Sequence, residues 1–195
     1  MTFSEQVENA KIQKRKENIE IIRNEIEKSW VKEKILNHLE NFEGLFTYEE
    51  IKEQILSNEL VAAKFCKDPS KQNISEKLAE QLLKTKKLPA SGKNCIRFSN
   101  TGELISTNEV GATKSADFKV GEYYATQKYT KEDGGAQDNQ RNDVIDFLTK
   151  GSIHHKVMAI LDGEYWDKNI VRLKENFSNN KNVIITSIDE LINND

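Results

Sequence analysis

Two short apolar runs near the C-terminus, residues 156–161 and 182–186, constrain the fold of this chain most. Each run has the length of a β-strand, and a stretch with helical character separates them. Apolar strands joined through a helix are typical of buried strands in a mixed or parallel sheet. We therefore expect a sheet with helices packed on it, which is an α/β domain.

An antiparallel hairpin is predicted upstream of these two strands. Residues 116–120 and 123–130 have strand character, and Gly121-Glu122 between them suits a two-residue type II′ turn, in which glycine comes first. Helices are expected at 74–86 and 136–149, and a further pair of strands at 94–98 and 103–106. The predicted fold class is α/β, with a central mixed sheet that contains the hairpin and is flanked by helices.

An N-terminal helical region is expected over residues 1–68, with the α/β core at 69–195, because Asp68-Pro69-Ser70 is a turn sequence. Residues 4–43 lack proline and glycine and have helical periodicity, which indicates one long helix or two. Thr47 and Glu50 form a capping box at the start of the next helix, with Phe46 and Ile51 as its hydrophobic staple. Two apolar stripes mark the first segment: Ile19, Ile22, Ile26 and Trp30, then Val31, Ile35, Leu39 and Phe42.

Charge is unevenly distributed along the chain. The net charge is −3, yet residues 61–100 hold nine basic and three acidic residues, a balance of +6, so the remainder carries −9. A basic stretch on an acidic protein can contact nucleic-acid phosphates, although a solvated lysine-rich surface is the simpler interpretation. No apolar run is long enough to span a bilayer, no secretory signal is recognisable, and Cys66 and Cys95 form no metal-binding pair. A cytoplasmic protein without a membrane partner is therefore expected.

The hairpin also determines which side chains share a face. A two-residue loop at 121–122 places Asp117 opposite Thr126, and strand alternation then puts Thr126 and Lys128 on the same face as Asp117. A carboxylate, a hydroxyl and an ammonium group grouped in this way can hold a divalent metal, a water and a phosphate. The simpler alternative is a surface salt bridge between Asp117 and Lys128.

At these residues the sequence resembles the PD-(D/E)XK nuclease superfamily. Ser115-Ala116-Asp117 corresponds to the first part of the family motif and Thr126-Gln127-Lys128 to the acidic-x-Lys triplet, and the resemblance covers roughly residues 70–192. Gln127-Lys128-Tyr129-Thr130, then 134–140, is similar to restriction endonucleases, and 182–192 is similar to the end of FokI-type cleavage domains. The resemblance implies a restriction-endonuclease-like core that uses Mg²⁺, with Asp117 as metal ligand and Lys128 as catalytic lysine.

One position departs from the family pattern. Thr126 stands where the family has its second carboxylate, and a hydroxyl is a poorer metal ligand. Gln127 is an alternative ligand if a β-bulge turns it inward, and Glu76, on the helix before the sheet, is another, since several relatives place a metal-linked Glu there. The number of metal ions therefore stays open.

Two sets of residues are candidates for DNA contacts. Gly134-Gly135 precedes a helix whose first turns hold Gln137, Asn139 and Gln140, where helix N–H groups can bind phosphate and amides can read adenine. Lys84, Lys86 and Lys87 in the basic stretch are candidates for phosphate contacts. A tight turn with solvated amides is an equally good interpretation of the first set.

Some further residues favour packing over chemistry. His154 and His155 lie between a helix and a strand without Cys or Glu at ligand spacing, so they are expected to be solvated rather than to bind metal. Tyr165 and Trp166 follow a strand end and are expected to pack rather than stack on bases.

The sequence thus predicts a type II restriction endonuclease that cuts both strands of double-stranded DNA at a specific site, as a homodimer with one site for each strand. A cognate methyltransferase would act on the same DNA site and need not bind the protein. The alternatives are a DNA-binding protein that keeps the scaffold without cleavage, and a helical interaction protein that acts through residues 4–43.

Overall fold

The computed structural model describes residues 1–42, 44–131 and 137–193. The described chain packs as two compact units. Met1–Gln6 and Ser75–Asp195 form one, called here the α/β unit, and Val7–Ile74 form the other, called here the helical unit. Among the described helices, none combines the length and apolar character that crossing a membrane requires.

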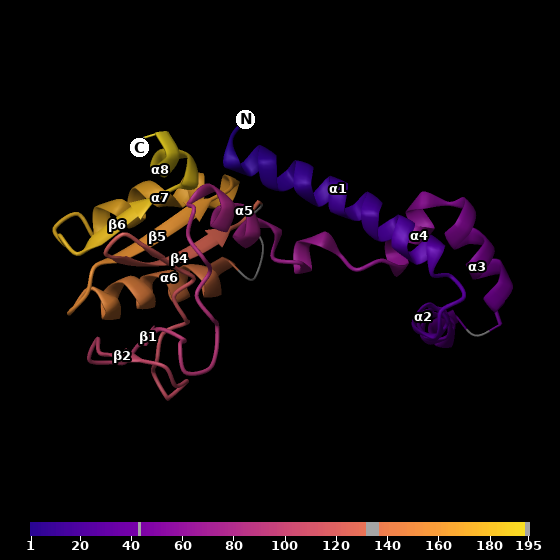
Figure 1. Ribbon diagram of the computed structural model, residues 1–195, viewed down its shortest axis with the longest axis horizontal. Coiled ribbons are helices and arrows are strands. Elements are labelled where there is room, and N and C mark those ends of the chain that lie inside the picture. The colour runs from indigo at the N-terminus through magenta and orange to yellow at the C-terminus, as the bar shows by residue number, and fades with distance from the viewer. Residues whose placement is uncertain (43, 132–136, 194–195) are drawn as a thin grey trace. The chain divides into compact units, whose positions relative to one another are not determined.

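The α/β unit is built on a mixed four-stranded sheet with the order β3-β4-β5-β6. β3 and β4 are antiparallel, whereas β4, β5 and β6 are parallel and run side by side (Figure 1). This confirms the predicted α/β class. In chain order the elements are α5 (Ile74–Leu82), β1 (Arg97–Phe98), β2 (Leu104–Ile105), β3 (Phe118–Val120), β4 (Tyr123–Tyr129), α6 (Gln137–Gly151), β5 (Val157–Asp162), α7 (Glu164–Asn176), β6 (Val183–Thr186) and α8 (Ile188–Asn193).

The β3–β4 hairpin has the predicted register. Phe118 pairs with Ala125, Lys119 with Tyr124, and Val120 with Tyr123. Gly121 has a φ of +56°, whereas the φ of Glu122 is negative. A positive φ at the first turn position alone is the mark of a type II′ turn, whose twist matches that of the two strands.

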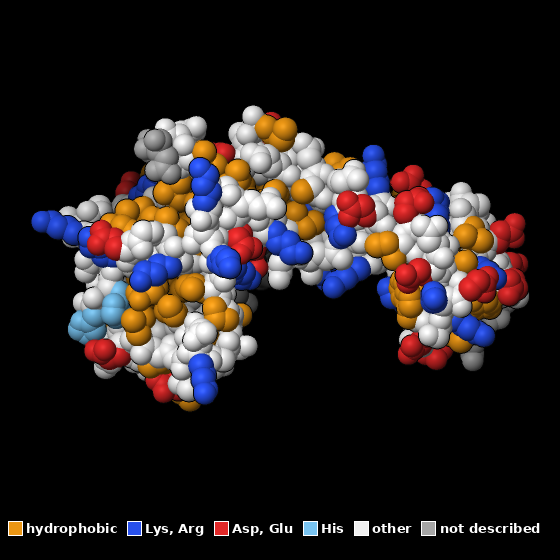
Figure 2. Space-filling view, in the orientation of Figure 1, with side chains coloured by type: hydrophobic (Ala, Val, Ile, Leu, Met, Phe, Trp, Pro, Cys, Tyr) orange, Lys and Arg blue, Asp and Glu red, His pale blue; other side chains and the backbone are white. Residues whose placement is uncertain are grey.

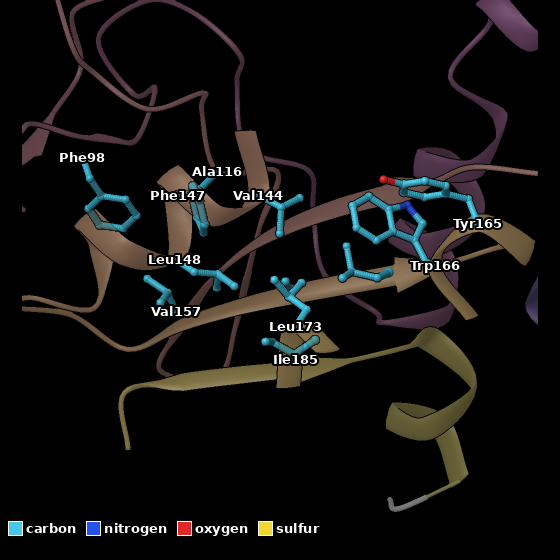
Figure 3. Close-up of a cluster of buried hydrophobic side chains, with 12 residues drawn as sticks. Phe98, Ala116, Val144, Phe147, Leu148, Val157, Tyr165, Trp166, Leu173 and Ile185 are labelled. Carbon is cyan, nitrogen blue, oxygen red and sulfur yellow. The ribbon is translucent and has the colours of Figure 1, made fainter. Parts of the chain in front are cut away.

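β5 is the buried centre of the sheet, and all six of its residues are buried. Val157, Ala159 and Leu161 lie on one face and pack with side chains of α6 and α7 (Figure 3). Tyr165 and Trp166 are part of this cluster, so the prediction that they pack is confirmed. The cluster also includes Phe98, Ala116, Val144, Phe147, Leu148, Leu173 and Ile185.

Gly163, directly after β5, packs closely against the backbone at the end of β4. Gly163 has φ +102°, and a Cβ placed on it would lie 2.3 Å from the carbonyl oxygen of Thr130. The Thr130 N–H donates to the carbonyl of Asp162 at 3.0 Å. Any larger residue at 163 would therefore push the C-terminal end of β4 away from β5.

Three elements are shorter than expected. The strands expected at 94–98 and 103–106 shorten to β1 and β2, which form a separate two-stranded antiparallel sheet. The helix expected to reach residue 86 ends at Leu82, because Lys84 adopts φ +50°. The N–H groups of Lys84 and Thr85 donate to the carbonyls of Gln81 and Glu80, the two bonds of a Schellman motif.

The helical unit has its own apolar core. The expected 4–43 segment forms two helices, α1 (Phe3–Asn24) and α2 (Ser29–Leu39), followed by a short 3₁₀ turn, η1 (Glu40–Phe42). α3 (Tyr48–Ser57), α4 (Glu59–Phe65) and the 3₁₀ turn η2 (Pro69–Lys71) complete the unit. The capping box of Thr47 and Glu50 is confirmed. The core residues are Ile19, Ile22, Ile26, Val31, Ile35, Ile51, Ile55, Ala62 and Phe65.

Candidate active site on the hairpin

The backbone of Asp117 is fixed from two sides, just before β3 begins. Its N–H donates to the carbonyl of Ala125 on β4 at 2.8 Å. Its carbonyl accepts from the N–H of Leu88 at 2.7 Å, so the segment after α5 forms the second neighbour. The Asp117 side chain is thereby held over the hairpin by bonds that depend on no particular side chain.

The Asp117 carboxylate accepts two hydrogen bonds from β4 and forms an ion pair with a third group of that strand. Its Oδ2 accepts the backbone N–H of Gln127 at 2.8 Å and the hydroxyl of Thr126 at 3.2 Å. The Lys128 Nζ lies 3.5 Å from the same oxygen. Asp117, Thr126 and Lys128 therefore meet on one face, as the register predicts. No hydrogen bond from the described part of the chain reaches Oδ1 of Asp117.

This ion pair is not a surface salt bridge. Only 8% of Asp117 is exposed, and 24% of the Lys128 side chain. Removing such charges from water costs several kcal/mol each unless good hydrogen bonds offset the cost. Here the Gln127 N–H and the Thr126 hydroxyl supply them. A pair held this way keeps the Lys128 ammonium in a defined position, which an exposed and mobile lysine would not have.

The donor set suits a hard cation that takes oxygen ligands. Mg²⁺ is commonly held by one or two carboxylates together with water and substrate phosphate oxygens. Asp117 offers Oδ1, and the Thr126 hydroxyl lies beside the same carboxylate. Among the described residues, no group of three or more His, Cys, Asp or Glu side chains is placed to hold a metal ion. Asp117 therefore fits a metal that would take its other ligands from substrate and water.

Gln127 contributes through its backbone, which the sequence could not reveal. Strand alternation directs its side chain to the face opposite Asp117, where Gln127 is 2% exposed. The side-chain nitrogen has no hydrogen-bond partner within the described residues. The structure thus brings the Gln127 N–H to the carboxylate and leaves its amide on the other side of the sheet.

Glu76, the second candidate carboxylate, forms an ion pair with Lys87. The Lys87 N–H also donates to Glu80 at 3.1 Å, and the next residue, Leu88, bonds the carbonyl of Asp117. Glu76 is therefore linked to the backbone of Asp117 through Lys87 and Leu88. Two of the three basic candidates, Lys84 and Lys86, are exposed, whereas Lys87 is half-buried.

The amide candidates lie in the first turn of α6. Gln140 accepts from the hydroxyl of Thr130 at 2.9 Å, and the same hydroxyl accepts from the Trp166 indole N–H at 3.1 Å. Asn139 is exposed and Gln137 is half-buried. The expected Gly134-Gly135 loop lies outside the described residues.

Asp162, which the sequence did not single out, is the most perturbed acid of the described chain. Burial raises the pKa of Asp162 to about 7, and Asp189, Asp167 and Glu190 add to the rise. The N–H of Ile188, at the start of α8, donates to Oδ1 at 3.1 Å and acts in the opposite direction. Oδ2 has no hydrogen-bond partner within the described residues. A carboxylate at the end of a buried strand carries no sequence signal that distinguishes it from a capping residue.

The two histidines differ from expectation in one respect. His154 is about half exposed, with its Nε2 3.6 Å from Glu103. His155 is half-buried and stacks on Phe98 with ring centroids 5.6 Å apart, so it packs rather than being solvated.

No protein-family model matches this chain, and neither a curated protein nor a solved structure gives a match. The chemistry of the site must therefore be inferred from its own residues and their geometry.

Proposed function

We propose that this protein is a metal-dependent DNA endonuclease with a PD-(D/E)XK-type site, and specifically a type II restriction endonuclease that cuts both strands of double-stranded DNA. The single observation that carries the proposal is the meeting of Asp117 and Lys128 at 3.5 Å on one hairpin face. An acid and a lysine on adjacent strands form the smallest set that can bind a metal and also stabilise charge on a phosphate.

The order of elements supports the same class. α5 precedes the sheet, the β3–β4 hairpin follows, and α6 leads into β5, the parallel neighbour of β4. This is the order of the restriction-endonuclease-like core that Ser115-Ala116-Asp117 and Thr126-Gln127-Lys128 suggest. The motif and the topology are independent properties of the chain, so their agreement strengthens the proposal.

Asp117 and Lys128 would have different roles in hydrolysis. A bound Mg²⁺ supplies Lewis acidity to the phosphate and makes its bound water a better nucleophile. Asp117 would hold it through Oδ1 while Oδ2 stays bonded to β4. Lys128 lies beside that carboxylate, where it can orient the attacking water or stabilise negative charge on the phosphate in the transition state.

DNA contacts are assigned to the residues that flank the hairpin. Lys84 and Lys86 are exposed and can bind phosphates directly, whereas Lys87 would have to exchange Glu76 for a phosphate. Asn139, Gln137 and Gln140 at the start of α6 are the proposed base-reading residues, although Gln140 already accepts from Thr130.

The test is digestion of unmethylated phage DNA by the purified chain with Mg²⁺, and with EDTA as the control. Discrete fragments are expected, because site-specific cuts occur at fixed positions. Asp117→Asn and Lys128→Met should each lower the cleavage rate by on the order of 10² to 10³-fold or more. Lys119→Met is the matched control, because Lys119 is an exposed lysine on the same hairpin. Undiminished cleavage by a folded Asp117→Asn variant would refute the site.

A second candidate function has one specific observation in its favour. Oδ2 of Asp117 is already saturated by β4 groups, and Thr126 stands where a second carboxylate would bind metal. A protein that binds DNA without cutting it would have this character. Salt-sensitive binding of duplex DNA, with no nicking of plasmid in Mg²⁺ or Mn²⁺, would establish that alternative.

A further inference from the structure

Three cations lie on one face of α1 within the helical unit. Lys11, Lys14, Arg15 and Asn18 are spaced i, i+3, i+4 and i+7, which places them along one side of a helix. Lys11 pairs with Glu8 at 2.9 Å and Lys14 with Glu17 at 2.8 Å. Solvent-accessible pairs of this kind contribute under about 1 kcal/mol, so both lysines can exchange their partners for a phosphate.

A buried asparagine fixes a second basic segment on that same face. Asn18 is 8% exposed, and its side-chain N–H groups donate to the carbonyl of Lys67 at 2.8 Å and to Gln72 at 3.3 Å. The segment between these two residues carries Lys71, in the 3₁₀ turn η2. Lys67 and Lys71 are exposed, and neither has an ion-pair partner within the described residues.

The one carboxylate in this segment is already occupied. The Ser70 N–H, donated to Asp68 at 2.9 Å, holds the pKa of Asp68 below its usual range, and the charges of Arg15 and Lys71 lower it further. Arg15 lies 3.8 Å from Asp68. Arg15 is the residue that pairs with Asp68, and Lys71 acts on this carboxylate only through its charge, so the segment keeps an excess of positive charge.

The charge of the helical unit is strongly segregated. Segments 11–15 and 66–73 together hold five basic residues and one acidic residue, a balance of +4. The whole of 7–74 holds twelve basic and thirteen acidic residues, or −1, so its remainder carries −5. Acidic side chains gather over α2 and α3 (Figure 2). A polyanion is therefore attracted to one side of the unit and repelled by the other.

We infer that Lys11, Lys14, Arg15, Lys67 and Lys71 form a phosphate-binding surface for the backbone of double-stranded DNA. Asn18 is its positioning residue, because it holds the 66–73 segment against α1. The inference rests on the proposed function and adds to it, since it assigns sequence-independent DNA contacts to the helical unit. A duplex presents a dense row of phosphates, and a surface of several fixed cations suits it better than it suits a single small anion.

The test is a salt titration of binding to a short fluorescent duplex in EDTA, which prevents metal-dependent cleavage. The triple variant Arg15→Gln, Lys67→Gln and Lys71→Gln should lower the slope of log K against log[salt] by about 2 to 3, since each phosphate contact contributes about 0.9. The control is Lys16→Gln, Lys28→Gln and Lys32→Gln, which removes the same charge from exposed lysines. Lys16 lies about 200° around the helix from Asn18. The control slope should change by less than about 1.

Each outcome gives a decision. Equal slopes for the two triple variants, with melting temperatures like wild type, would overturn the surface even if plasmid nicking in Mg²⁺ upholds the nuclease. If the wild type does not nick plasmid in Mg²⁺ but the two triple variants still differ in salt slope as expected, the proposed function is overturned and the DNA contacts stand. If the triple variant lost binding to vesicles that contain anionic phosphatidylserine but kept the wild-type salt slope on DNA, the DNA surface would be overturned in favour of a lipid partner.

Discussion

The Asp117 carboxylate is held by a main-chain donor and a side-chain donor, and the two have different consequences. The Gln127 N–H is present whatever residue occupies position 127, and it makes the shorter bond, 2.8 Å. The Thr126 hydroxyl bonds the same oxygen at 3.2 Å and is lost on substitution. The orientation of Asp117 therefore depends more on the β4 backbone than on Thr126.

Thr126→Val should accordingly be a mild change. It removes the hydroxyl and keeps the β-branched shape, so we expect a loss of about 1 kcal/mol in unfolding free energy and less than about tenfold in cleavage rate. Glu76→Gln should be severe if Glu76 supplies the second carboxylate. The measurement is the Mg²⁺ dependence of the cleavage rate for both variants. Near-complete loss of cleavage by Thr126→Val, at an unchanged melting temperature, would show that the Thr126 hydroxyl is a required ligand.

Asp162 should make the protein less stable as the pH rises. Its folded pKa of about 7 exceeds the ordinary value of 3.8. Between those values the folded protein keeps a proton that the unfolded chain has released, so the free energy of unfolding falls from about pH 4 to about pH 7 and levels off above. Asp162→Asn removes this penalty and should stabilise the protein at pH 8 by at most about 4 kcal/mol.

Urea unfolding of wild type and Asp162→Asn at pH 4, 6 and 8 measures this difference. The two proteins should converge at pH 4, where the wild-type carboxyl is protonated in the folded state. Asp138→Asn, an exposed acid in α6, is the control and should track the wild type. A constant difference between Asp162→Asn and wild type at all three pH values would show that hydrogen bonding, rather than burial of charge, sets the effect.

At the scale of elements, the C-terminal end of α5 contains a residue that does not match its backbone. Lys84 occupies the left-handed position of the Schellman motif, where a side chain costs about 1 kcal/mol and glycine costs nothing sterically. Lys84→Gly should therefore raise the melting temperature by a few degrees. Calorimetry on Lys84→Gly and on Lys84→Gln separates the backbone effect from the loss of charge. A lower melting temperature for Lys84→Gly than for Lys84→Gln would contradict the expected relief of backbone strain.

The β3–β4 turn and the end of α5 show where sequence reasoning succeeds and where it fails. Gly121 encodes its turn, so the hairpin register and the shared face of Asp117, Thr126 and Lys128 could be predicted residue by residue. Lys84 gives no such signal, because lysine is a good helix former, and the helix was expected to continue to 86. The backbone donors of Gln127 and Leu88 also escape prediction, since every residue but proline has an N–H.

At the scale of the whole molecule, one chain offers one candidate site, whereas a double-strand cut requires two hydrolytic events. The helical unit also leaves several large apolar side chains exposed, and these are available for contact with a partner. Among its described residues, those at least 37% exposed are Ile12, Ile21, Trp30, Leu36, Phe42, Leu45, Phe46, Leu56 and Leu60. We propose a second copy of the chain as the partner, because two-fold symmetry would supply the second site.

We therefore expect a homodimer of about 45 kDa, twice the chain mass of 22.4 kDa, with the N-terminal helices in or beside the interface. Sedimentation equilibrium at micromolar concentration, with and without DNA, measures the mass. Phe46→Glu with Leu60→Glu should shift the protein towards monomer, because both side chains are exposed apolar groups of the helical unit, 51% and 80% accessible. Val171→Glu, an equally exposed position on α7, is the control and should leave the dimer intact. A wild-type monomer under both conditions that still cuts both strands would rule out the symmetric arrangement.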